Sequence, residues 1–291
     1  RELNGVSIVS RSVFEPEALH RYVGGVDATP ARWTPSLIDA YRETGRLRHG
    51  PVLATLGCPM HCSYCASGAL QPSFLVRDIH LVAHEVSYLS EHMDVRDFAF
   101  YDDALLYRPG RGLRPLLRAL RKHRNKARFH LPNGLHLRWL TRPLLDGMKE
   151  AGFETLRFGY ESGHRRRADA VSHKATRRLT ERKVELVLQT GFSPTRVGIY
   201  VMAGLPGQTP AEVLEDIAFV AGLGILVKPV FVSPVPRTRL FDTYAREFPA
   251  LRDDPRWHND TFFISRLPRW GWNAAQEIHG AARRFNRALR A

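Results

Sequence analysis

The sequence has few cysteines, few lysines and no long hydrophobic run. Its longest apolar stretches, such as residues 218–227, fall well short of the ~20 residues that a membrane-spanning helix needs. The first residues, RELNGVSIVSRS, contain no basic segment followed by an apolar signal core. These absences predict a soluble, cytoplasmic protein with no membrane partner.

Lysine is scarce although the chain is strongly basic. The net charge is +14 at pH 7, and only six of the 43 basic residues are lysine. Arginine is dense at residues 114–128 and 164–182. Such charge attracts polyanions, so RNA is an open but not favoured partner. The alternative is a solvated, arginine-rich surface.

The overall composition is otherwise that of an ordinary globular protein. Of 291 residues, 44% are hydrophobic and 25% are charged, which excludes a disordered or fibrous chain. The length predicts one large domain or two small ones, with a substantial core.

The three cysteines lie within eight residues, at Cys58, Cys62 and Cys65. An odd number so closely spaced cannot build a disulfide framework. A zinc site would need a fourth ligand, for which His61 is available. A 4Fe–4S cluster held by three thiolates would leave one iron open to a ligand that is not protein. The third alternative is three small thiols with no metal.

The segment GCPMHCSYC, residues 57–65, resembles the C-x3-C-x-aromatic-C signature of the radical S-adenosylmethionine (SAM) superfamily. The resemblance implies that Cys58, Cys62 and Cys65 bind a 4Fe–4S cluster and that SAM is a cofactor. It further implies that the reduced cluster cleaves SAM to a 5′-deoxyadenosyl radical, with Tyr64 beside the adenine. Packing within the loop is the alternative role for Tyr64.

Strand and helix patterns alternate after the cysteines. Apolar runs predict six strands, at residues 52–57, 97–101, 127–131, 154–160, 195–202 and 225–232. Helical periodicity or capping residues follow the first five of them. Six such units predict an α/β fold, a partial (β/α)6 TIM-like barrel of parallel strands. We expect a short N-terminal extension over residues 1–50, the barrel over 51–240, and a C-terminal extension over 241–291 ending in a helix.

Polar side chains and glycines gather where these strands end, which is where α/β barrels place their chemistry. They are Asp102 and Asp103, Asn133 and Gly134, Glu161 and Ser162, and the loop GLPGQT with Gly204 and Gly207. All of them except Gly134 are predicted to contact cofactor. Arg157 shares a strand face with Glu161 by period-two alternation.

The resemblance implies a role for most of these residues. One of Asp102 and Asp103 receives the amino group of the SAM methionine, while the other caps a helix. Glu161 and Ser162 contact the ribose, and the backbone around Gly204 and Gly207 receives the adenine. Arg157 is expected to reach the methionine carboxylate, or else to neutralise an aspartate.

Several further segments resemble the cobalamin-associated branch of the superfamily, among them FAFYDDALLY, FHLPNGLHLRWLT and GFETLRFGYES. Only 57 residues precede Cys58, and a cobalamin-type D-x-H-x-x-G motif is not found. Cobalamin, if used, is therefore expected from a missing domain or from a partner. At the sixth strand, Pro-Arg-Thr at residues 236–238 replaces the branch's usual Pro-Gly-Thr.

The leading hypothesis is a radical SAM enzyme, a transferase in its methylating form, that functionalises a C–H bond of a small-molecule substrate. A low-potential donor such as flavodoxin or ferredoxin would supply the electron. Modification of tRNA or another RNA is one alternative. A non-catalytic metal-binding scaffold is the other.

Overall fold

The structure is a computed structural model that describes residues 49–122, 127–172 and 175–291. The N-terminal extension expected over residues 1–50 lies almost wholly outside these described residues. The chain forms two compact units. Unit 1 comprises Arg1–Pro59, Leu70–Asn133 and Pro143–Thr155, and unit 2 comprises Met60–Ala69, Gly134–Arg142 and Leu156–Ala291.

Six parallel strands form one sheet in the order β1-β4-β5-β6-β7-β8. Their bounds are β1 Gly50–Val52, β4 Asp97–Phe100, β5 Arg128–Leu135, β6 Phe153–Tyr160, β7 Val197–Ala203 and β8 Leu226–Phe231. This confirms the predicted α/β class and is consistent with a partial barrel. No closed barrel is observed among the described residues.

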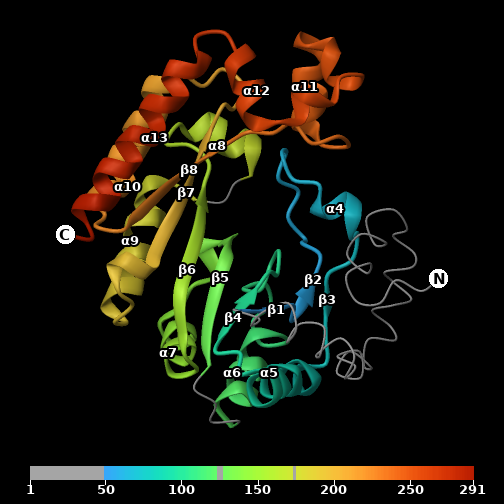
Figure 1. The fold of residues 1–291 in the computed structure, drawn as a ribbon, viewed down its shortest axis with the longest axis vertical. Coiled ribbons are helices and arrows are strands. Elements are labelled where there is room, and N and C mark those ends of the chain that lie inside the picture. The colour runs from blue at the N-terminus through green and yellow to red at the C-terminus, as the bar shows by residue number, and fades with distance from the viewer. Residues whose placement is uncertain (1–48, 123–126, 173–174) are drawn as a thin grey trace. The chain divides into compact units, whose positions relative to one another are not determined.

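The helices follow the strands along the chain (Figure 1). The α-helices are α4 Ser67–Leu70, α5 Ile79–Met93, α6 Leu113–Lys122, α7 Arg142–Glu150, α8 Arg165–Val171, α9 Arg177–Gln189, α10 Pro210–Gly222, α11 Arg239–Glu247, α12 Asp260–Arg266 and α13 Gly271–Ala288. Short 3-10 turns are η2 Leu137–Trp139, η3 Pro194–Arg196, η4 Pro249–Arg252 and η5 Pro255–His258. Within the described part of the chain, no helix has the length and apolar character needed to cross a bilayer.

Unit 1 contains β1, β4 and most of β5, with α5 and α6 packed side by side (Figure 1). Asp78 caps the start of α5 by accepting from two backbone amides, and Asp94 ends it in a left-handed conformation. The apolar positions of α5, such as Val82, Val86 and Leu89, are fully buried, as their spacing predicts. They anchor the helix in the core of unit 1.

The first predicted strand is wrong in one respect. Residues 52–57 do not form a single strand: β1 ends at Val52, and a separate β2 (Thr55–Leu56) pairs antiparallel with β3 (Leu75–Val76). The break coincides with hydrogen bonds from the backbone amides of Ala54 and Thr55 to the Asp102 side chain. A buried carboxylate therefore takes these two donors at the point where the strand is interrupted.

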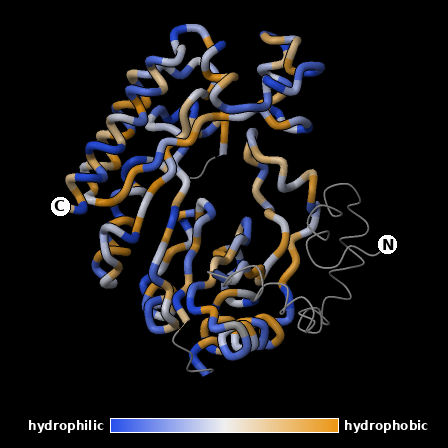
Figure 2. Tube along the Cα trace, in the orientation of Figure 1, coloured by the Kyte–Doolittle hydropathy of each residue, from blue (hydrophilic) through white to orange (hydrophobic). Residues whose placement is uncertain are grey.

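Unit 2 contains β6, β7 and β8 with α9, α10, α12 and α13. Thr209 and Glu212 form a reciprocal capping box at the start of α10, with Pro210 in its first turn, as predicted. Helix α13 packs on α10 and β8, and Figure 2 shows hydrophilic and hydrophobic residues alternating along it. Asn286 of α13 accepts a hydrogen bond from the Val227 amide and donates one to the Val227 carbonyl. Its side chain therefore supplies both backbone hydrogen-bond partners of one residue of β8.

Candidate functional site

Within unit 2, hydrogen bonds to its backbone hold the segment that carries Cys62 and Cys65. The Ser63 amide donates to the Val171 carbonyl, and the Leu240 amide donates to the Ser63 carbonyl, both at 2.8 Å. Arg239 Nη2 donates to the His61 carbonyl at 2.8 Å. The stretch between the two thiols is thus tied to the end of α8 and the start of α11.

Cys58 lies in unit 1, and Cys62 and Cys65 lie in unit 2. None of the three forms a disulfide, and Cys65 is exposed. Within the described ranges, no group of three or more His, Cys, Asp or Glu side chains is gathered to hold a metal ion. The donor set fits a 4Fe–4S cluster, because three cysteines that form no disulfide lie within eight residues.

Tyr64 stands between the two thiols of unit 2 and points at the end of β6. Its hydroxyl donates to Glu161 Oε1 at 2.9 Å. Burial raises the pKa of this phenol, and the nearby charges of Glu161 and Cys62 raise it further. The structure thus brings together two residues that the sequence places 97 positions apart. Glu161 and Ser162, the expected ribose contacts, are 3% and 2% exposed.

The two neighbouring aspartates of unit 1 have different surroundings. Asp102 is 2% exposed and accepts from the amides of Ala54 and Thr55 and from the Thr55 hydroxyl. Burial raises its pKa to about 6, although these hydrogen bonds act in the opposite direction. Asp103 is exposed. Asp102 therefore serves the backbone of unit 1, and Asp103 is the carboxylate open to a ligand.

Asn133 is placed differently from the sequence prediction. It lies inside β5, which extends to Leu135, rather than after the strand. Its Nδ2 donates to the carbonyls of Tyr101 and Asp102, at 2.7 and 3.2 Å. The amide therefore fixes the backbone that leaves β4, immediately beside Asp103 in the sequence.

Arg157 points away from Glu161. Its Nη1 donates to the carbonyls of Leu156 and Arg196, at 2.9 and 2.6 Å. Arg196 precedes β7, so the guanidinium is held at the end of the unit 2 strands where they begin, whereas Glu161 follows the end of β6. The structure does not bring Arg157 together with Tyr64 and Glu161.

The loop from Gly204 to Thr209 is held by side chains on every side. Gln208 Oε1 accepts from the amides of Gly204 and Leu205, and its Nε2 donates to the Met202 carbonyl. Tyr244 donates to the Gly204 carbonyl, and Trp270 Nε1 donates to the Gln208 carbonyl. Gly204 has a φ of +90°, which strains any other residue, and a Cβ there would also meet the end of the Ile264 side chain.

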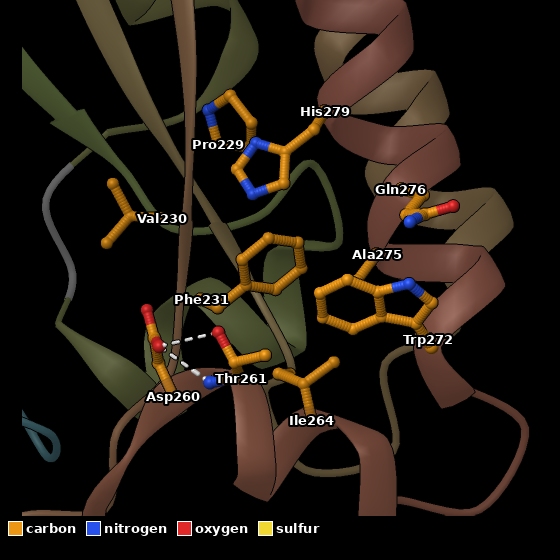
Figure 3. A pocket seen from close by; sticks show the side chains of 10 residues that line it. All are labelled: Pro229, Val230, Phe231, Asp260, Thr261, Ile264, Trp272, Ala275, Gln276 and His279. Carbon is orange, nitrogen blue, oxygen red and sulfur yellow. Dashed lines mark hydrogen bonds between the residues drawn. The ribbon is translucent and has the colours of Figure 1, made fainter.

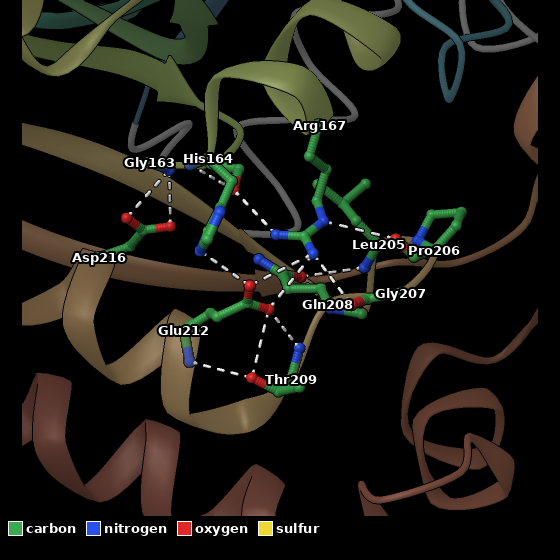
Figure 4. A network of polar contacts seen from close by, with 12 residues as sticks. Gly163, His164, Arg167, Leu205, Pro206, Gly207, Gln208, Thr209, Glu212 and Asp216 are labelled. Atoms are coloured by element: carbon green, nitrogen blue, oxygen red, sulfur yellow. Dashed lines mark hydrogen bonds and ion pairs between the residues drawn. The ribbon is translucent and has the colours of Figure 1, made fainter.

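Arg167 is a residue of this site that sequence reasoning missed (Figure 4). Its guanidinium donates to the Pro206 and Gly207 carbonyls and to Ser162 Oγ, at 3.4, 2.9 and 3.4 Å. It also pairs with Glu212 at 3.3 Å and is only 16% exposed. Arg167 therefore joins the loop to the end of β6. Its signal was hidden in the run Arg165–Arg166–Arg167, which reads as a basic surface.

A separate pocket lies between β8, α12 and α13 in unit 2 (Figure 3). Its volume is about 240 Å³, and Phe231, Trp272 and His279 contribute aromatic walls. None of the predicted site residues lines it. The pocket shares Ile264 with the surroundings of Gly204.

Comparison with known proteins gives the class of the chain. The model of the radical SAM superfamily matches residues 52–220, which is more than half of the sequence. The chain belongs to the radical SAM superfamily.

Two curated relatives are methyltransferases by name. An uncharacterized methyltransferase of Pyrococcus horikoshii is 25% identical over 216 residues, which cover 70% of this chain and 44% of that protein. The bacteriochlorophyllide d C-12(1)-methyltransferase of Chlorobaculum tepidum is 39% identical over 62 residues, covering 20% of this chain and 14% of the enzyme. The chain therefore spans less than half the length of either relative.

Among solved structures, the fold is similar to that of TsrM, a radical SAM methyltransferase from Kitasatospora setae. That structure, with tryptophan and a SAM analogue bound, gives a TM-score of 0.62 at 20% identity over 72% of this chain and 40% of TsrM. A second TsrM structure, with cobalamin and a [4Fe–4S] cluster bound, gives 0.61. These likenesses establish the fold.

Proposed function

We propose that this chain reductively cleaves SAM at a 4Fe–4S cluster held by Cys58, Cys62 and Cys65, and that it functionalises a C–H bond of a small molecule by methylation. The observation that carries the proposal is the three-thiol motif at the start of a superfamily match over residues 52–220. The names of the two curated relatives support the methyltransfer.

When bound, the cluster would supply one low-potential electron to the SAM sulfonium, and the protein would supply position and exclusion of water. The iron that has no thiolate would be open to the methionine end of SAM. Asp103 is our candidate for the methionine ammonium, because its exposed carboxylate matches that charge. Asp102 is engaged by unit 1, so we assign it the structural role.

Within unit 2 we assign the adenosine end of SAM. Tyr64 donates to Glu161 Oε1 and so helps to orient this carboxylate, and we assign Glu161 to a ribose hydroxyl. Arg167 and Gln208 hold the loop around Gly204 and Gly207, where backbone groups would receive the adenine. No role toward SAM is assigned to Arg157, since its guanidinium is held at the far end of the strands.

The cobalamin bound in one of the TsrM structures supports a cobalamin-dependent methyl transfer. We propose that cobalamin would be held outside the described residues of this chain, by another segment or a partner. A flavodoxin or ferredoxin remains our candidate for the electron donor.

The test is anaerobic reconstitution with iron and sulfide, followed by EPR of the reduced protein with and without SAM. We expect a 4Fe–4S signal that SAM perturbs, release of 5′-deoxyadenosine, and loss of both in Cys62→Ala. His61→Ala is the matched control, because its side chain is exposed and would matter only as a zinc ligand. Stoichiometric zinc that His61→Ala removes, with no response to SAM, would refute the proposal and favour the metal scaffold.

A further inference from the structure

One face of the unit 2 strands is open and carries charge. Strand register pairs Arg157 with Gly198, and Tyr200 with both Gly159 and Lys228. Paired residues and residues two apart project to the same face of a sheet, so Arg157, Tyr200 and Lys228 share one face. Lys228 is exposed there, and Arg157 and Tyr200 are half-buried.

The opposite face is the apolar core. Phe158 and Ile199, which alternate with the residues above, are fully buried, as is Val227. The charged residues of the open face therefore lie outside the apolar packing that stabilises the sheet.

Two cations, Arg157 and Lys228, share this face, and together with Arg196, just before β7, and Arg290, just after α13, we call them the cation patch. Burial lowers the pKa of Arg157, and the charges of Arg196 and Arg290 lower it further, against the opposing effect of Tyr200. Burial likewise lowers the pKa of Lys228, as do the charges of Arg157 and Arg290. The two cations that the strand register places on this face therefore both have a pKa lowered in part by other positive charges.

No carboxylate among the described residues forms an ion pair with any member of the cation patch. Like charges at short range repel, most strongly where water is partly excluded. Both hydrogen bonds of Arg157 use Nη1, whereas a guanidinium has five N–H donors. The arrangement is thus short of negative charge and retains donors in the planar geometry that carboxylates and phosphates accept.

We propose that the cation patch binds an acidic group, a carboxylate or a phosphate, on the substrate of this enzyme. The proposal rests on the proposed function, which assigns the ribose of SAM to Glu161, just past the end of β6 and four residues beyond Arg157. At about 3.3 Å per residue this separation is roughly 13 Å. The substrate class is therefore an anionic small molecule whose acidic group lies about that far from the ribose end of SAM.

The test measures anion binding to the whole chain reconstituted with its cluster and free of SAM, and SAM is titrated in parallel. Sodium phosphate and sodium acetate are each titrated by calorimetry, with sodium chloride holding the ionic strength constant. We expect saturable binding of at least one anion, and the stronger of the two identifies the acidic group. Arg157→Gln and Lys228→Gln should each weaken it roughly tenfold, as for loss of a charge-assisted hydrogen bond. Arg283→Gln, at an exposed arginine of α13, removes the same charge and should leave binding unchanged.

Two results would overturn the proposal. One is the absence of saturable binding, or an equal loss in Arg283→Gln, which would show a diffuse electrostatic effect. The other is a matching loss of SAM affinity in Arg157→Gln, which would assign the patch to the methionine carboxylate. Release of 5′-deoxyadenosine by the wild-type chain is measured separately. Anion binding without that release would reject the proposed function alone, and the reverse would reject only the anion site.

Discussion

The buried carboxylate of Asp102 predicts an unusual dependence of stability on pH. Its pKa in the folded protein is about 6, against an ordinary value of 3.8 for this carboxyl. For a carboxyl whose folded pKa is raised, the folded state binds the proton more tightly than the unfolded state does. Its contribution to stability is then fully present below pH 3.8 and is lost as the pH rises through about 6.

The size of this effect follows from the shift. A difference of about two pKa units corresponds to about 3 kcal/mol, at 1.36 kcal/mol for each unit. Most of this falls between pH 7 and pH 4, where we expect about 2 kcal/mol from this one group. Because Asp102 is 2% exposed, solvent screening reduces the value little.

The assay is urea unfolding of the wild-type chain and of Asp102→Asn at pH 4, 5, 6 and 7. Asparagine keeps an acceptor for the amides of Ala54 and Thr55 but cannot titrate. The variant should therefore be more destabilised, relative to wild type, at pH 4 than at pH 7, by about 2 kcal/mol. Asp103→Asn, at the exposed neighbour, should show no such difference. Parallel curves for wild type and Asp102→Asn across this range would refute the reasoning.

Three further substitutions test the site of unit 2 by urea unfolding. Arg167→Gln should lower the free energy of unfolding by about 2 kcal/mol, because it removes donors to two carbonyls and to Glu212. The control, Arg165→Gln, lies at an 88% exposed side chain and should change the free energy of unfolding by less than about 0.5 kcal/mol. Equal losses in the two variants would contradict the role of Arg167. Gly204→Ala should lower the free energy of unfolding by more than about 2 kcal/mol, given the φ of +90° and the contact with Ile264. The control is Gly222→Ala, where a Cβ would have no atom within 4 Å. This variant should be neutral or stabilising by up to about 1 kcal/mol. Tyr64→Phe should lower the free energy of unfolding by about 1–2 kcal/mol, because it removes one donor to Glu161. Tyr101→Phe, at an exposed ring, is the control. Equal losses in the two variants would show that the bond from Tyr64 to Glu161 contributes nothing.

The sequence predicts the strands well because their apolar runs are long and are interrupted by turns. The strand over residues 154–160 matches β6 at Phe153–Tyr160 closely. The strand over 52–57 fails because the donors of Ala54 and Thr55 turn to Asp102, which is 48 and 47 residues away. No local pattern contains that bond.

At the site, too, the sequence predicts what local patterns determine and misses what contacts between distant residues determine. Strand ends locate Asp103, Glu161 and Gly204, because parallel strands present their ends at one edge of a sheet. The direction of Arg157 was not predictable, since the Arg196 carbonyl that holds it lies 39 residues away. Residue type alone does not separate a guanidinium that meets a ligand from one that meets backbone.

The domain boundaries and the site residues remain predictions. The C-terminal extension expected from residue 241 begins inside α11, Arg239–Glu247. That helix starts with the Arg239 contact to the His61 carbonyl. Any division of the chain at this point would therefore cut a helix that holds the cysteine segment.

The loop from Gly204 to Thr209 is fixed by hydrogen bonds from within the chain, made by Gln208, Tyr244, Trp270 and Arg167. Ordering a free loop costs about 1–2 kcal/mol for each residue in lost backbone entropy. A preorganised loop has already lost that freedom during folding, so a ligand does not have to order it on arrival. Affinity at this loop should therefore depend on the fit of the ligand rather than on closure of the chain around it.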